Sequence, residues 1–273
     1  MKIFAIRDEQ SLQEQDLAYL FCYERQGTFY IELPENADPW EVPLILSSFL
    51  RRGEKTVNAY WSKIWVQQRI VPPDRQNLGQ ILRDNGVKTY NELDLLERTG
   101  GRCAQDSFFL TPVGRNDLPD GIIQRFGQRV EDVVPLSGFC LLVFFRNGKV
   151  KRCDIEAILR SDRAYQPILK FEELFQQATV ETGGYGVRWG DDQVIPYDLL
   201  YGTGKDVPLS LDDFVAFSAQ RVINTREAME ILNCSRQNID DLVRRGQLHP
   251  IKKTYKNTLF LKSEVTARLW GQV

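Results

Sequence analysis

The sequence has few cysteines and a single histidine, which narrows the chemistry that it can support. Five cysteines stand singly along the chain, at positions 22, 103, 140, 153 and 234, and His249 is the one histidine. A disulfide framework or a zinc site needs closer groupings of these residues. We therefore expect no metal site, no cofactor and no disulfide, as in proteins of the reducing cytoplasm.

Long apolar runs are also absent. No stretch of the sequence approaches the roughly 18 uninterrupted apolar residues of a membrane span, and the opening residues, MKIFAIRDEQ, lack the pattern of a secretory signal. Apolar residues still make up 42% of the 273 residues, which is enough for two small domains with buried cores. We expect a folded, soluble, cytoplasmic protein with no membrane contact.

The groupings of residues that catalysis requires are missing as well. Glu172 and Glu173 are adjacent on a predicted helix, so their carboxylates diverge. This geometry is poor for a pair that acts as general acid and general base. The segment Gly202-Thr203-Gly204-Lys205 lacks the first glycine of a phosphate-binding P-loop and reads as an ordinary loop. The sequence predicts that the chain has no catalytic residues and is not an enzyme.

The net charge of −2 conceals an uneven distribution along the chain. Residues 221–262 hold nine basic and four acidic side chains, a net charge of +5, and residues 263–273 are neutral. Residues 1–220 therefore carry a net charge of −7. An acidic body with a compact basic tail is typical of proteins in which one module contacts a polyanion such as nucleic acid.

The pattern of elements predicts three parts and an overall α+β class. Residues 1–117 form a small mixed α/β region, residues 122–209 a small α+β domain with hairpins, and residues 219–273 a winged helix-turn-helix.

In the first part, short strands and helices alternate. The segment FYIELP, residues 29–34, predicts a strand that Pro34 ends. Two short helices are predicted over residues 75–86 and 89–101, the second with Thr89 as its cap and Glu92 completing a capping box. Another helix is predicted before Gly53, because side chains recur at helical spacing at Trp40, Leu44, Ile45, Ser48 and Phe49. We expect Trp40, Trp61 and Trp65 to pack in a core.

The middle part contains two hairpin patterns. An apolar run ends at Asn147-Gly148, a pair that favours a type I′ turn, and residues 179–202 predict a second hairpin. Over about 75 residues this part resembles a small bacterial domain family of unknown function. The resemblance is carried by Asn147-Gly148, Asp154-Ile155, the Phe-rich segment 171–175, Trp189-Gly190 and the segment Asp198-Leu199-Leu200-Tyr201. It implies a fold and no catalytic residues.

The basic tail predicts two helices separated by a short turn. Thr225 is the expected cap of the first helix, and Asn233 can adopt the left-handed conformation that ends it. Ser235 is the expected cap of the second helix, and Gly246 ends it. Residues 248–252 and 258–262 then predict two strands joined at TYKN, followed by a closing helix capped by Ser263.

With these elements in place, the tail resembles the winged helix-turn-helix of the MerR and excisionase superfamily over about 45 residues. The matching features are the Thr225 cap with Glu227 and Ala228, the turn at residues 232–235, the Arg-Arg-Gly-x-Leu segment at 244–248 and the basic strand pair. The resemblance implies that the Ser235 helix enters the major groove of double-stranded DNA while the strand pair, as a wing, touches the flanking backbone.

The predicted contacts with DNA follow from that placement. Gln237, Asp241 and Arg244 lie on the helix face opposite Ile239, so we expect them to face base edges or phosphates. Phosphate contacts are expected from the strand pair. The full set of expected DNA-binding residues is Thr225, Ser235, Arg236, Gln237, Asn238, Asp241, Arg244, Arg245, Lys252, Lys253 and Lys256.

Two features keep a second interpretation open. Asp240 and Asp241 place carboxylates on the reading helix, where phosphates repel them. The tail also lacks the long dimerisation helix of MerR regulators, so a homodimer or partner contact would have to come from residues 1–220. The first hypothesis is a bacterial-type transcriptional regulator with N-terminal sensing or partner domains. The alternative is a protein-interaction module or antitoxin-like adapter that docks a protein partner.

Overall fold

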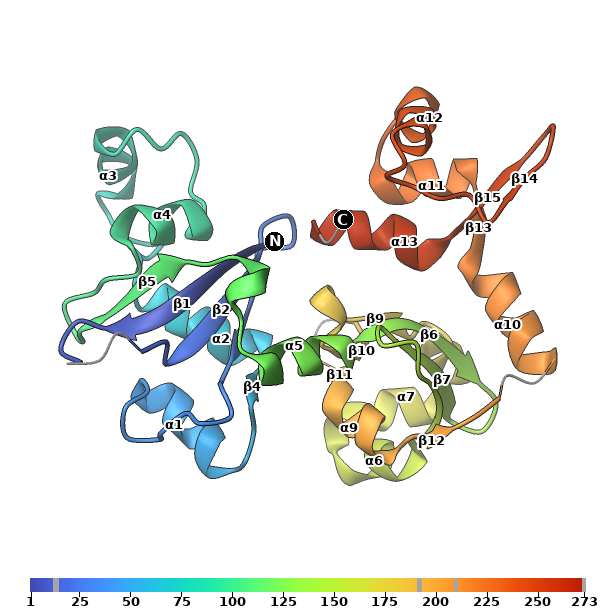
Figure 1. Cartoon of the computed structure of the whole chain (residues 1–273), viewed down its shortest axis with the longest axis horizontal. Coiled ribbons are helices and arrows are strands. Elements are labelled where there is room, and N and C mark those ends of the chain that lie inside the picture. Colours follow the sequence, from blue (N-terminus) through green and yellow to red (C-terminus); the bar gives the residue numbers. More distant parts are fainter. Residues whose placement is uncertain (12–14, 191–192, 209–210, 272–273) are drawn as a thin grey trace. The chain divides into compact units, whose positions relative to one another are not determined.

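A computed structural model describes residues 1–11, 15–190, 193–208 and 211–271. The chain divides into two compact units, Met1–Gln124 and Arg125–Val273. Both units combine antiparallel sheets with short helices, so the predicted α+β class is confirmed (Figure 1). The predicted boundary at residue 209 and the hairpin turn at residues 191–192 lie outside the described residues.

The first unit is built on an antiparallel five-stranded sheet with the order β4-β3-β2-β1-β5. Its central strand β2 is buried along its whole length, because it has hydrogen-bonded neighbours on both sides and packing on both faces. The predicted FYIELP strand is β3. The strands are β1 (Lys2–Asp8), β2 (Ala18–Tyr23), β3 (Thr28–Glu32), β4 (Thr56–Val57) and β5 (Phe108–Pro112).

Short helices connect and cover these strands. Helix α2 packs on β3 and also contacts α4. Helix α5 (Asp120–Gly127) leads from the first unit into the second. The other helices of the first unit are α1 (Leu44–Arg51), α2 (Ala59–Gln67), α3 (Leu78–Asp84), α4 (Glu92–Thr99) and the 3-10 turn η1 (Arg115–Asp117).

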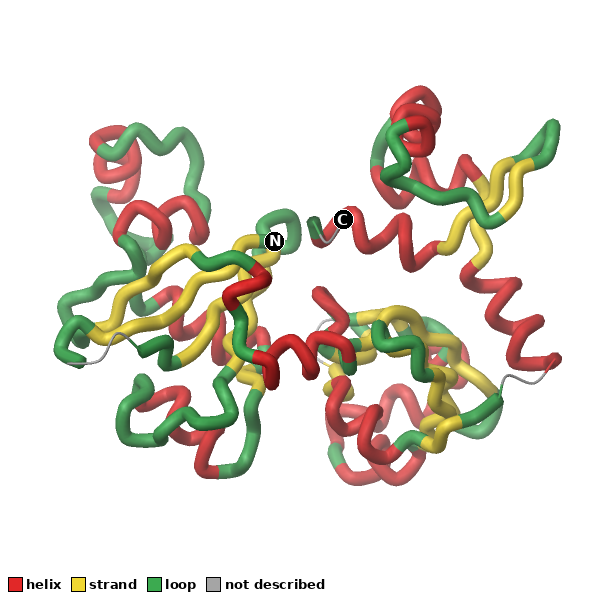
Figure 2. The backbone as a smooth tube through the Cα atoms, viewed as in Figure 1, coloured by secondary structure: helices red, strands yellow, loops and turns green. Residues whose placement is uncertain are grey.

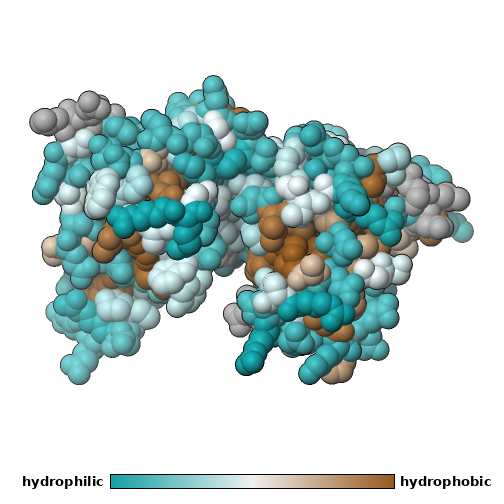
Figure 3. Space-filling view, turned by 90° about the horizontal axis from the view of Figure 1, so that it is seen from below, coloured by the Kyte–Doolittle hydropathy of each residue, from teal (hydrophilic) through white to brown (hydrophobic). Residues whose placement is uncertain are grey.

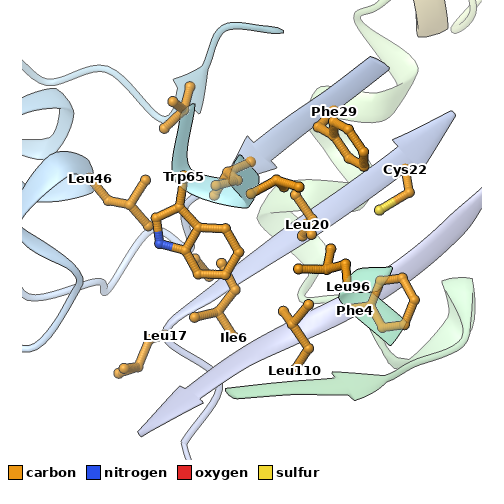
Figure 4. Close-up of a cluster of buried hydrophobic side chains, with 14 of the residues drawn as sticks. Phe4, Ile6, Leu17, Leu20, Cys22, Phe29, Leu46, Trp65, Leu96 and Leu110 are labelled. Carbon is orange, nitrogen blue, oxygen red and sulfur yellow. The ribbon is translucent and has the colours of Figure 1, made fainter. Parts of the chain in front are cut away.

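The core of the first unit lies between the sheet and these helices. Figure 4 shows the indole of Trp65, on α2, among Ile6, Leu20 and Leu46. Trp65 is 1% exposed, and the guanidinium of Arg69 lies 3.8 Å from the centre of its ring. Arg69 is buried in turn and pairs with Asp106 at 2.5 Å. The prediction of core packing is therefore confirmed for Trp65, and it is wrong for Trp61, which is 41% exposed.

Trp40 corrects the prediction made from helical spacing. Helix α1 begins at Leu44, directly after Pro43, so Trp40 precedes it and is 83% exposed. The buried face of α1 consists of Leu46, Ser47 and Phe49, which leaves Leu44 exposed. Asp38 accepts a hydrogen bond from the backbone N–H of Trp40, which fixes a turn before the helix. Trp40 is one of ten large hydrophobic residues that are exposed among the described residues. The face of the molecule seen in Figure 3 is mainly hydrophilic, with smaller hydrophobic areas.

A second correction concerns the start of α4. Asn91 caps this helix, and its side-chain oxygen accepts from the N–H groups of Leu93 and Asp94 at 2.9 and 3.1 Å. The predicted cap, Thr89, lies two residues earlier. Asn91 takes the position because its extended backbone places the amide within reach of the free N–H groups of the first turn.

The middle part of the chain, which opens the second unit, holds a four-stranded sheet, β12-β8-β7-β6, and a three-stranded sheet, β11-β10-β9. All of the pairings are antiparallel. The strands are β6 (Val130–Leu136), β7 (Cys140–Phe145), β8 (Val150–Asp154), β9 (Thr179–Val180), β10 (Gly186–Trp189), β11 (Gln193–Pro196) and β12 (Lys205–Asp206).

The helices of this middle part follow the strands closely. Helix α9 and strand β12 occupy the segment around Gly202 to Lys205 that was predicted to be a loop. The helical elements are α6 (Glu156–Ser161), η2 (Arg163–Tyr165), α7 (Gln166–Lys170), α8 (Glu172–Phe175), η3 (Thr182–Gly184), α9 (Tyr197–Thr203) and α10 (Leu211–Arg221).

The hairpin between β7 and β8 is present, but its turn differs from the predicted type. A type I′ turn needs positive φ at both central residues, whereas here Gly148 has a φ of +80° and Asn147 does not. The Gly148 N–H donates to Phe145 O, and the Phe145 N–H donates to Lys149 O. This pattern is typical of a three-residue loop that ends in a left-handed glycine.

Candidate nucleic-acid interface

The last part of the chain consists of two adjacent helices beside a small sheet. Strands β13 (Val222–Asn224), β14 (Lys252–Lys253) and β15 (Thr258–Leu261) form the sheet in the order β13-β15-β14. The β14–β15 hairpin projects beyond the helices (Figures 1 and 2). The helical elements are α11 (Thr225–Leu232), α12 (Arg236–Arg244), α13 (Lys262–Ala267) and the 3-10 turn η4 (Arg268–Trp270).

The turn between α11 and α12 forms as its residues predict. Asn233 ends α11 in the left-handed conformation, with φ 48° and ψ 52°. The Ser235 side chain then accepts the Asn238 N–H at 3.3 Å and caps α12. Three residues, 233–235, therefore connect the two helices, and both helices turn apolar side chains toward one small core. Its buried members are Ile223, Ala228, Ile239, Leu248, Phe260 and Val265.

The cap of α11 corrects the assignment of Thr225. Asn224 is the cap, and its side-chain oxygen accepts from the N–H groups of Arg226 and Glu227 at 2.8 and 3.1 Å. Glu227 returns the bond by accepting the Asn224 N–H at 2.8 Å, which completes a capping box. Thr225 instead donates through its hydroxyl to Thr258 O at 3.5 Å, between α11 and β15. The spacing of Asn224 and Glu227, Asn-x-x-Glu, is the capping-box pattern by which the sequence could have indicated this cap.

Replacing Asn224 with Ala should lower the free energy of unfolding by about 1 kcal/mol, because two N–H groups of the first turn lose their acceptor. The matched variant Thr225→Val, which removes one long hydroxyl contact, should have a smaller effect. Urea denaturation of the full chain measures both. An equal or larger loss for Thr225→Val would restore Thr225 as the cap.

The outer face of α12 carries most of the residues that were predicted to contact DNA. Arg236, Gln237 and Asn238 are exposed in its first turn, and Arg244 and Arg245 are exposed at its end. Ile239, on the opposite face, is 1% exposed. The structure thus brings the polar residues of this helix to solvent as its periodicity predicted.

Asp241 is half-buried and forms an ion pair with Arg244. The two side chains approach to 2.5 Å, one turn apart on the helix. This contact partly neutralises Arg244 and gives one of the two unexpected carboxylates of the helix a local partner. Asp240 is exposed beside it.

The β14–β15 hairpin presents the remaining cations. The strand pair is present but shorter than residues 248–252 and 258–262 predicted, with Lys252 opposite Leu259 and Lys253 opposite Thr258. Lys256 lies in the connecting turn, where Thr254 and Asn257 exchange hydrogen bonds. All three lysines are exposed.

The sheet contains a strand that sequence reasoning missed. Strand β13 pairs with β15 and leads directly into α11. Only three residues long, Val222–Asn224 carries too little periodicity to be recognised without its partner. Leu261, and not the predicted Ser263, occupies the cap position of α13.

His249 has a structural contact within this part. Glu264 accepts from the His249 backbone N–H at 2.8 Å and lies 2.8 Å from its ring Nδ1. Arg268 donates to Gln247 O at 2.5 Å. These contacts join the segment after α12 to α13 and to η4.

The charges of this surface are largely uncompensated. Within the described ranges, no carboxylate forms an ion pair with any of five exposed cations, Arg236, Arg245, Lys252, Lys253 and Lys256. Exposed, unpaired cations on a helix and an adjacent hairpin suit an extended anion such as a nucleic-acid backbone.

Neither a metal-binding group of side chains nor a membrane-spanning helix is seen in the part of the chain that the structure describes. It contains no group of three or more histidine, cysteine or carboxylate side chains that could hold a metal ion. None of its helices has the length and apolar character that crossing a bilayer requires.

Two family models match parts of this chain. Residues 222–273 match the helix-turn-helix domain family, and residues 130–206 match a protein family of unknown function, DUF2442. Both resemblances drawn from the sequence are thereby confirmed. No curated protein matches the chain. One crystal structure, of protein NE0471 from Nitrosomonas europaea ATCC 19718, a candidate DNA-binding protein, is similar over 45% of this chain and 79% of its own, with 23% identity and a TM-score of 0.26.

Proposed function

We propose that this chain is a transcriptional regulator that binds double-stranded DNA through residues 222–270. The observation that carries the proposal is the set of exposed cations without carboxylate partners on α12 and the β14–β15 hairpin of a helix-turn-helix domain. DNA offers a regular array of phosphates to such a surface, and the exposed face of a helix fits its major groove.

In this proposal α12 reads bases and the hairpin acts as a wing. Gln237 and Asn238, exposed in the first turn of α12, can form paired hydrogen bonds with adenine, and Arg236 can do so with guanine. Asp241 holds Arg244 in place instead of contacting cytosine. The cations of the hairpin contact the flanking phosphates, which set the register without reading sequence.

The remaining residues supply regulation in this proposal. The first unit and the DUF2442-matching domain are assigned to sensing, to a protein partner or to self-association. No catalytic step is assigned to any part of the chain. The acidic charge of residues 1–220 keeps the body away from phosphates, so contact with DNA is confined to the tail.

The experiment that tests this function is fluorescence anisotropy of the full chain with a random duplex of about 30 base pairs, at about 50 and 200 mM salt. The wild type should bind, and its affinity should fall steeply with salt. The double variant Lys252→Ala/Lys253→Ala should bind about tenfold more weakly at low salt, and the slope of log affinity against log salt should fall in magnitude by about 2.

A matched control distinguishes the effect of losing contacts on the hairpin from the effect of lowering the net charge of the protein. The variant Arg163→Ala/Lys170→Ala removes two exposed positive charges from the middle domain and should bind DNA as the wild type does. Equal weakening by both double variants would refute the assigned surface. A wild type that does not bind at low salt would favour the alternative, in which α12 docks a protein partner.

A further inference from the structure

Helix α10 forms part of the covering of the middle sheet. The register of β6 and β7 places Asp132 opposite Phe144 and Val134 opposite Leu142, so these four side chains share one face. Val134 and Leu142 are fully buried. Phe217 of α10 packs against Phe144, with the ring centres 4.8 Å apart, and α10 contacts β6. The helix before the helix-turn-helix is therefore packed on this sheet.

Arg221, the last residue of α10, forms a buried ion pair with this sheet. Its Nε lies 2.8 Å from Oδ1 of Asp132, and its Nη2 donates to the carbonyl oxygen of Val133. The two charged side chains are only 9% and 6% exposed. Burial raises the pKa of Asp132, and the positive charge of Arg221 opposes that rise. Removing either partner would leave an uncompensated buried charge.

The helix-turn-helix begins immediately after this ion pair. Val222 follows Arg221 and is the first residue of β13, which pairs with β15. Lys262, the first residue of α13, is close enough for its pKa to be lowered by burial and by the charge of Arg221. The sheet that supports α11 therefore begins at the residue that follows the ion pair.

We propose that the Arg221–Asp132 ion pair is a clamp that joins the DUF2442-matching domain and the helix-turn-helix into one rigid body. Arg221 is a positioning residue in this arrangement: it contacts no DNA and fixes the direction in which the helix-turn-helix leaves the sheet. The consequence for DNA binding rests on the function proposed above, whereas the clamp itself does not. A ligand or partner that moved β6 would then also move α12.

Hydrogen–deuterium exchange on the full chain tests the clamp. In Arg221→Gln and in Asp132→Asn, exchange over residues 215–224 should rise about tenfold, while β7 and α11 should keep the exchange of the wild type. The double variant should resemble each single variant, because the two residues act as a pair. Arg226→Gln, which removes an exposed ion pair with Glu230, is the control and should change nothing there.

If Arg221→Gln and Asp132→Asn both unfold, the milder variant Arg221→Lys still tests the clamp. Arg221→Lys keeps the charge but lacks the fork that reaches both Asp132 and Val133, so its exchange over residues 215–224 should rise above that of the wild type by less than tenfold. Unchanged exchange in Arg221→Lys, or an equal rise across β7 and α11, would overturn the clamp. Anisotropy with DNA is read separately, so a wild type that fails to bind DNA leaves the exchange result valid.

Discussion

Replacing Ile239 with Ala should abolish measurable DNA binding at physiological salt. Ile239 is 1% exposed and belongs to a core with six buried members among the described residues. Truncating a buried isoleucine costs about 3 kcal/mol, and a domain of about 50 residues has little more than that in reserve. The loss of binding would therefore follow from the loss of folded α12 and not from a lost contact with DNA.

Gln237→Ala is the matched control on the opposite face of the same helix. Gln237 is exposed, so its truncation should leave the urea midpoint unchanged while lowering affinity by up to about tenfold at a preferred site. Near-ultraviolet circular dichroism and anisotropy measure the two effects on the same samples. An Ile239→Ala protein that bound DNA normally would show that α12 is not the reading element.

Trp65→Ala should destabilise the first unit by about 3–5 kcal/mol. The indole is almost fully buried among side chains of the sheet and of α1, and the guanidinium of Arg69 stacks on it. Without the ring, Arg69 would lose its cation–π contact inside the core. Thermal unfolding followed by tryptophan fluorescence and by circular dichroism should show a transition at lower temperature.

Trp40→Ala is the control for this variant, because Trp40 is 83% exposed, with the guanidinium of Arg51 4.8 Å from the centre of its ring. Its effect on the free energy of unfolding should stay within about 0.5 kcal/mol. Comparable destabilisation by both variants would mean that Trp40 is packed in solution against a part of the protein or a second copy. The pair therefore also tests the exposure of this tryptophan.

Local chemistry explains why the helix-turn-helix was recognisable before its structure was known. The turn needs one residue that tolerates positive φ and one that can cap a helix, and Asn233 and Ser235 meet these needs in order. The apolar positions of α12 then determine which face is exposed. Every step depends on residues within about four positions of one another, so no distant contact is needed to predict it.

Predictions failed where several local solutions were equally good. Thr225 and Asn224 are both competent caps, and the pairing of β13 with β15 places Asn224 at the helix start. In the same way, the spacing of Trp40 and Leu44 fits a helix, yet Pro43 begins α1 later and turns another face inward. Strand pairing therefore selected the cap of α11, whereas the restricted backbone of Pro43 selected the start of α1.

Composition, charge asymmetry and short-range patterns were enough to indicate the α+β class and the basic helix face, because these properties depend on residue type and near neighbours. The two matched domains were indicated by resemblance to known families. The buried Arg221–Asp132 pair could not be foreseen in this way, since 88 residues separate its partners and each alone reads as an ordinary surface charge. Its place was decided by sheet register, which puts Asp132 on the face that α10 covers. Long-range packing therefore determines how the helix-turn-helix is held, while local sequence determines what it presents to a partner.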